Sequence, residues 1–107
     1  MTISDHQQWL VNFYQKRHWY QYSPFVHLGI LTEETGEVSR AIRATEIGRD
    51  HPSEKKATPA ELQANLKEEL ADVLDLVLVI SSLYDIDAQD LLEASEQKLT
   101  HRFENEK

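Results

Sequence analysis

Helix-capping signals divide this chain into four segments, and this division constrains the fold more than any other feature of the sequence. Ser23–Pro24 fits an N-cap followed by proline at the first helical position. The stretch from Thr58 to Glu61 repeats this signal and adds a capping box, and Asp87 is a further N-cap. The signals predict helices over residues 4–20, 24–47, 59–84 and 88–104, with a polar loop at 48–58. Because no alternating, strand-like run exceeds a few residues, we expect an all-α fold.

The length of 107 residues allows one domain, spanning residues 1–107. The predicted helix 59–84 is apolar on nearly all sides after Val73, and such a helix must be covered from several directions. Three short neighbouring helices would not cover it within one chain. We therefore expect a four-helix bundle that is completed by homo-oligomerisation, as a homodimer or a homotetramer.

The charge of the chain is unevenly distributed. Residues 61–107 hold twelve acidic side chains against four basic ones and so carry the whole formal charge of −8, whereas residues 1–60 hold seven of each. This balance argues against binding to nucleic acid polymers or to anionic membranes, but it leaves room for anionic ligands bridged by a metal ion. The absence of cysteine excludes disulfides and thiolate metal sites. The N-terminus has no signal-peptide pattern and the apolar stretch 73–83 is too short to span a bilayer, which predicts a cytoplasmic protein.

Two acidic clusters on the central predicted helices carry the candidate chemistry. Their members are Glu33, Glu34 and Glu37 on the first of these helices, and Glu68, Glu69, Asp72 and Asp75 on the second. Side chains three residues apart share a helix face, so Glu34 lies beside Glu37, and Glu69 lies beside Asp72. These faces also carry apolar residues that need burial, and carboxylates facing a core cannot all stay ionised without cations. Hard divalent cations fit this need, with Mg²⁺ as the first candidate and Mn²⁺ as the second.

Two neighbours of the clusters have separate interpretations. Glu33 points about 100° away from Glu34 on the helix, so it is either solvated or supports a ligand from outside. Gly36 within a predicted helix costs about 1 kcal/mol relative to alanine. Such a glycine predicts either close packing or the close approach of a ligand.

Each acidic cluster contains a short motif, E-x-x-E at residues 34–37 and E-x-x-D at residues 69–72. Together and in this order they resemble the motifs of the MazG-like all-α nucleotide pyrophosphohydrolases. Residues 31–38 are similar to the L-x-E-E-x-G-E-L of that family, and residues 68–74 are similar to its E-E-L-x-D-V-L. Trp19 followed by Pro24, and a final K-x-x-x-R formed by Lys98 and Arg102, extend the resemblance over about residues 9–103.

The resemblance implies Mg²⁺-dependent hydrolysis of a (deoxy)nucleoside triphosphate to its monophosphate and pyrophosphate, which would remove non-standard or surplus nucleotides. The metal ligands that it implies are Glu34, Glu37, Glu69 and Asp72. Either Glu37 or Glu33 would accept the proton of the attacking water, and the sequence leaves this choice open. One departure from the family is that thirty-one residues separate Glu37 from Glu69. The extra length falls in and before the polar loop, where it bears on the substrate pocket.

Four further residues are candidates for contact with the substrate. Lys98 and Arg102, one turn apart, would bind phosphates from the last helix. Trp19 would stack on the nucleobase, although a place in the core is an equal alternative. Asp75 would orient a metal ligand or line the base pocket.

Two hypotheses without catalysis stay open. The chain could be a nucleotide-sensing or metal-sensing module without turnover, or a structural helical bundle whose acidic residues are only solvated. Four intact ligand positions favour the enzyme. Among the basic residues, Arg40 and Arg43 are interpreted as solvated charges, and Arg49 in the loop as a residue able to reach a phosphate.

Overall fold

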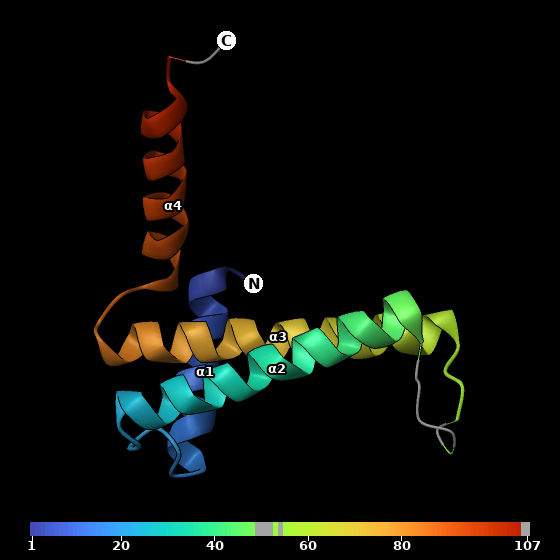
Figure 1. Cartoon of the computed structure of the whole chain (residues 1–107). Coiled ribbons are helices and arrows are strands. Elements are labelled where there is room, and N and C mark those ends of the chain that lie inside the picture. The colour runs from blue at the N-terminus through green and yellow to red at the C-terminus, as the bar shows by residue number, and fades with distance from the viewer. Residues whose placement is uncertain (49–52, 54, 106–107) are drawn as a thin grey trace. The chain divides into compact units, whose positions relative to one another are not determined.

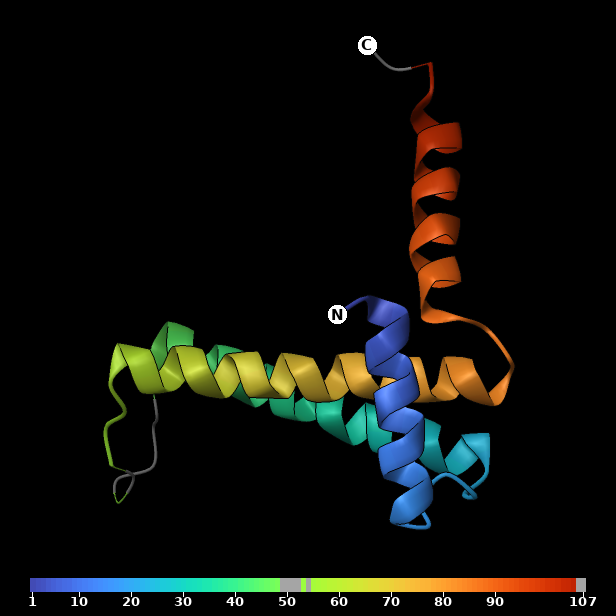
Figure 2. The same cartoon turned by 180° about the vertical axis from the view of Figure 1, so that it is seen from behind.

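The computed structural model describes residues 1–48, 53 and 55–105, and these residues form four α-helices and no strand (Figures 1 and 2). The helices are α1 (Ile3–Lys16), α2 (Pro24–Ile47), α3 (Pro59–Leu83) and α4 (Ala88–Phe103). The predicted all-α fold is confirmed, and Arg49 lies outside the described residues. Among the described residues, none of the helices combines the length and the apolar character needed to cross a membrane.

The helices begin at capping side chains that bind free backbone N–H groups. At the start of α3 the predicted capping box is present, since Thr58 and Glu61 each accept a hydrogen bond of 3.1 Å from the backbone N–H of the other. Ser23 and Asp87 cap α2 and α4 as predicted. A similar capping box at Thr2 begins α1, and it was not predicted from the sequence.

The first helix is shorter than predicted: α1 ends at Lys16, whereas the sequence predicted an end at residue 20. His18 adopts a φ of 63°, in the left-handed region. Its N–H donates to the carbonyl of Gln15 at 3.1 Å, and the N–H of Trp19 donates to the carbonyl of Tyr14 at 2.9 Å. These two bonds form a Schellman motif, which ends a helix. Glycine is the usual residue at the left-handed position, so the histidine at this position did not predict the end of the helix.

The chain divides into two compact units, and the first consists of Met1–Tyr22 and Leu78–Lys107. Its buried apolar core contains Leu10, Leu78, Val79 and Ala88. Gln7, only 6% exposed, lies in the same unit, and its Nε2 donates to the carbonyls of Leu78 and Ile86 at 3.0 and 3.1 Å. Its Oε1 accepts a bond of 2.8 Å from the N–H of Ala88. A single side chain thus connects α1 with the end of α3 and the start of α4.

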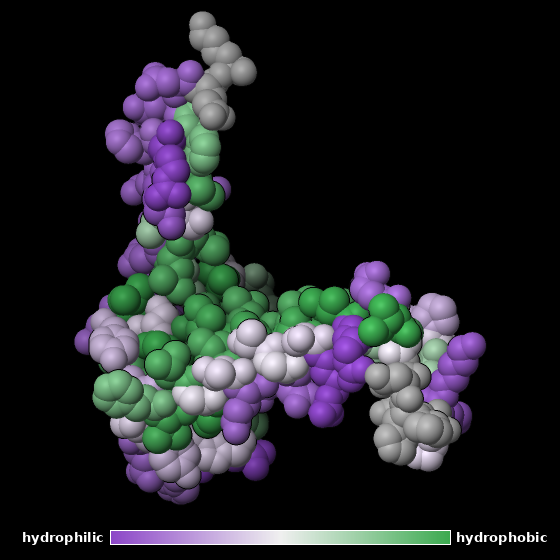
Figure 3. Space-filling view, in the orientation of Figure 1, coloured by the Kyte–Doolittle hydropathy of each residue, from purple (hydrophilic) through white to green (hydrophobic). Residues whose placement is uncertain are grey.

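The second unit, Ser23–Val77, consists of α2 and most of α3, which run side by side in opposite directions in both views (Figures 1 and 2). Among its described residues, the buried side chains are those of His27, Ala41 and Leu76. Many of its large apolar side chains remain exposed, and Figure 3 shows hydrophobic surface along this helix pair. They are Phe25, Val26, Leu28, Ile42, Ile47, Leu70, Leu74 and Val77. The described residues of this unit therefore leave much apolar surface in contact with solvent.

Candidate metal site

Three carboxylates from α2 and α3 meet within the Ser23–Val77 unit. Glu34 on α2, and Glu69 and Asp72 on α3, each place one carboxylate oxygen within 4.8 Å of the other two. Glu69 and Asp72 share one face of α3, as their spacing predicted. Oxygen atoms of this kind are the ligands that hard divalent cations prefer. We refer to these three residues as the acidic group, and their donor set fits a cation such as Mg²⁺.

Desolvation and mutual repulsion raise the pKa of each member of the acidic group, which makes the group receptive to positive charge. Desolvation is the largest cause of the raised pKa of Glu34, and the neighbouring carboxylates add to it, with Asp72 and Glu69 first. Desolvation is also the largest cause of the raised pKa of Glu69, and the charge of Asp72 is the second. Asp72 has a raised pKa for the same first reason, although a hydrogen bond with Glu34 acts in the opposite direction. A cation bound here would relieve this repulsion.

The other predicted carboxylates surround the acidic group. Glu37, which the family motif implied as a fourth ligand, is exposed and is not among the three residues whose oxygens meet. Its charge nevertheless raises the pKa of two members of the group. Glu33 acts in the same way on Glu34, and the half-buried Asp75 acts on Asp72. All three therefore lie within electrostatic range of the site.

Asp72 is exposed in the single chain, whereas Asp75 is half-buried. The sequence predicts that a second copy of the chain completes the burial of this part of α3, and that prediction is not tested by the single chain. Leu70 and Leu74, the apolar neighbours of Asp72, are themselves 51% and 46% exposed. Within the described residues of the single chain, this segment is therefore open to solvent.

The three predicted substrate-binding residues outside these helices belong to the other unit. Trp19 lies in the turn after α1, where its ring makes edge contacts with Phe13 and Tyr14 at centroid distances of 6.0 and 5.4 Å. It remains 41% exposed, so it packs on its own helix and still offers part of its ring to solvent. Lys98 and Arg102 are exposed on α4. The structure brings the carboxylates together, and for these three residues contact with a substrate stays a prediction.

Arg40 is a residue whose relation to the site was not predicted from the sequence. It is exposed on α2, and its positive charge lowers the pKa of Glu69, against the larger causes that raise it. Its position three residues after Glu37 places it one turn along the same helix. That spacing is the signal that could have indicated it.

Gly36 has open space where a side chain would begin, so packing among the described residues does not explain it. The same is true of Gly29 in the same helix. We expect Gly36→Ala and Gly29→Ala each to raise the free energy of unfolding by up to about 1 kcal/mol, measured by urea unfolding of the metal-free protein. If Gly36 permits close approach of a ligand, only Gly36→Ala will also weaken nucleotide binding. Destabilisation by both variants would contradict the open space at these positions.

The sequence, the fold and this site together identify the family. The pattern of the MazG nucleotide pyrophosphohydrolase domain matches residues 24–106, and the chain belongs to this family. The protein YvdC of Bacillus subtilis (strain 168), itself uncharacterized, is 43% identical over 105 residues, which cover 98% of this chain and 99% of YvdC. The crystal structure of YPJD from Bacillus subtilis, provisionally described as a pyrophosphatase, matches with a TM-score of 0.65 at 22% identity. The match covers 96% of this chain and 95% of YPJD, and it shows a shared fold.

Proposed function

We propose that this chain hydrolyses (deoxy)nucleoside triphosphates to monophosphate and pyrophosphate in a reaction that depends on Mg²⁺, with Mn²⁺ as a substitute. The observation that carries the proposal is the meeting of Glu34, Glu69 and Asp72 within the part of the chain, residues 24–106, that matches the MazG domain. We propose these three as metal ligands, with Glu37 as a fourth. In this proposal residues 1–107 act as one MazG-like domain, which removes non-standard or surplus nucleotides in the cytoplasm.

The residues of the acidic group and its surroundings have distinct roles in this reaction. A bound divalent cation supplies neutralisation of phosphate charge and lowers the pKa of water at the site. Glu37 or Glu33, both exposed beside the group, accepts the proton of the attacking water. The water oxygen attacks the α-phosphorus, the bond from this phosphorus to the bridging oxygen breaks, and pyrophosphate leaves with the electron pair of that bond.

The proposal includes four candidate residues for substrate contact. Lys98 and Arg102 bind phosphate oxygens, since both are exposed cations one turn apart on α4. The exposed part of the Trp19 ring stacks on the nucleobase. Asp75, whose charge acts on Asp72, orients that ligand or lines the base pocket.

We further propose that a second copy of the chain covers the apolar surface of the α2–α3 pair, giving a homodimer or a homotetramer. Phe25 and Ile47 are 83% and 75% exposed, and the half-exposed Leu70 and Leu74 flank the acidic group on α3. Exposed apolar side chains in this number are typical of an interface. Such a partner would also cover the acidic group more fully than one chain does.

The proposed activity is tested by incubating the protein with a panel of standard and modified nucleoside triphosphates and measuring pyrophosphate. We expect release from at least one nucleotide with Mg²⁺, and none when EDTA removes the metal. No release from any nucleotide, with either Mg²⁺ or Mn²⁺, would contradict the proposal. In that case thermal stabilisation by Mg²⁺ would favour a sensing module, and its absence would favour a structural bundle.

A further inference from the structure

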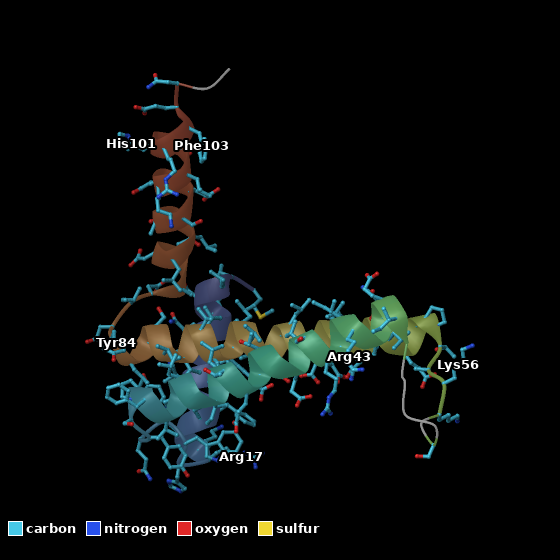
Figure 4. All side chains as sticks on the ribbon, in the orientation of Figure 1. Arg17, Arg43, Lys56, Tyr84, His101 and Phe103 are labelled. Atoms are coloured by element: carbon cyan, nitrogen blue, oxygen red, sulfur yellow. The ribbon has the colours of Figure 1, made fainter. Side chains whose placement is uncertain are left out.

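Arg17, labelled in Figure 4, lies at the C-terminal end of α1 against two aromatic rings. Its guanidinium carbon is 4.9 Å from the centre of the Phe13 ring and 5.9 Å from the centre of the Trp19 ring. Both distances are within the range of a cation–π interaction. Among the described residues, the guanidinium takes part in no hydrogen bond or ion pair, so these two rings are its partners.

The contacts of Arg17 restrict the ring of Trp19. The planes of the Phe13 and Trp19 rings are inclined by 62° with their centres 6.0 Å apart, and the guanidinium contacts both rings. Tyr14 makes a second edge contact with Trp19, at 5.4 Å and 86°. The indole is therefore held by a cation and two rings, all from the same unit, and it is still 41% exposed.

A ring that stacks on a nucleobase binds best when it is already fixed. An indole that rotates freely in the unbound protein loses this freedom when the base stacks on it, and the lost entropy weakens binding. A ring that the free protein already holds avoids this loss. The contribution of one exposed cation–π interaction corresponds to a factor of about two to five in a binding constant.

We propose that Arg17 is a positioning residue for the nucleobase and that it acts through Trp19, whose ring it holds in place for stacking. The inference rests on the proposed function, in which Trp19 stacks on the base, and adds to it the residue that fixes this ring. It makes two demands. Arg17 must strengthen the binding of ligands that carry a base without affecting pyrophosphate, and its effect must disappear when the Trp19 ring is removed.

The test compares Arg17→Gln with a matched control, Lys16→Gln. Lys16 is an exposed cation in the last turn of α1, and its side chain makes no ring contact among the described residues. We expect Arg17→Gln to raise KM for the nucleotide about two- to fivefold and to change kcat less than about twofold, because uniform binding is lost. Lys16→Gln should behave as the wild type does. Arg17→Lys keeps the cation without the planar guanidinium, so its KM should lie between those of the wild type and Arg17→Gln.

Two further measurements distinguish an action through Trp19 from a direct contact with phosphate. Titration calorimetry at saturating Mg²⁺ compares the nucleoside monophosphate product with inorganic pyrophosphate, and Arg17→Gln should weaken the binding of the monophosphate only. Trp19→Ala should raise KM by itself. In the Trp19→Ala background, Arg17→Gln should raise KM no further, because the ring through which it acts is missing.

The outcomes separate this inference from the proposed function. If the wild type hydrolyses nucleotides and Arg17→Gln has the KM of the wild type, the inference is wrong although hydrolysis stands. Weaker binding of pyrophosphate by Arg17→Gln, or an undiminished effect in the Trp19→Ala background, would show that Arg17 does not act through Trp19. An equal rise in KM for Lys16→Gln would reduce both effects to general charge and would also overturn the inference. If the wild type hydrolyses no nucleotide, the proposed function fails, and the inference fails with it.

Discussion

Replacing Glu34 by glutamine is expected to lower the rate of nucleotide hydrolysis by more than about 100-fold and to abolish stabilisation by Mg²⁺. Glu34 is the contribution of α2 to an acidic group whose other members, Glu69 and Asp72, come from α3. Glutamine has nearly the same size, so the helices can keep their packing while the group loses a negative charge. The rate is measured as pyrophosphate release, and metal binding as the change in Tm on adding Mg²⁺.

The same variant tests the raised pKa of Glu34 through the pH dependence of stability. The pKa of Glu34 is raised in the folded protein, by desolvation first and then by its acidic neighbours. For such a group the stabilising contribution is present below the pKa of the unfolded state and is lost as the pH rises through the folded pKa. The metal-free wild type should therefore lose this contribution toward neutral pH, whereas Glu34→Gln should not. Urea unfolding in EDTA over a pH series measures the difference, which we expect to favour the variant near pH 7.

Two further substitutions make the Glu34 result specific. Glu46, exposed near the end of α2, lies outside the acidic group, and Glu46→Gln should hydrolyse nucleotides as the wild type does. Glu37→Gln should lose both turnover and Mg²⁺ stabilisation if Glu37 is a ligand, but only turnover if it accepts the proton of the attacking water. A Glu34→Gln variant with wild-type activity would show that the metal site has been assigned to the wrong residues.

The spacing of residues along α3 made two of the three members of the acidic group predictable. Glu69 and Asp72 share a face because they are three residues apart, and this local rule holds whatever the rest of the chain does. The same rule placed Glu37 beside Glu34, yet only Glu34 joins the acidic group. Which flank of α2 meets α3 depends on the rotation of α2 about its own axis. Tertiary packing determines that rotation, and the rotation cannot be inferred from the spacing of the acidic residues.

The fold shows the same division between local and non-local causes. The starts of α2, α3 and α4 were predictable because each capping residue acts on N–H groups within its own first turn. The end of α1 was not, because His18 adopts a left-handed conformation that histidine seldom signals. The exposure of Asp72 was also beyond the sequence, since it depends on which surfaces other elements cover. Gln7 was overlooked for a similar reason, because its partners are distant in sequence.

Gln7→Ala is expected to lower the free energy of unfolding by about 3 kcal/mol, the largest stability effect that we predict for a single side chain. The substitution removes three hydrogen bonds at a position that is only 6% exposed, and it leaves the N–H of Ala88 without the side-chain oxygen that it now donates to. The neighbouring Gln8 is an internal control, because it is exposed and its Nε2 donates to the side-chain oxygen of Asn12, one turn away on the same helix. Gln8→Ala should change the stability by less than about 0.5 kcal/mol in the same urea titration. If the two variants were equally stable, water would be replacing the bonds of Gln7, and this side chain would not be what holds α1 to the ends of α3 and α4.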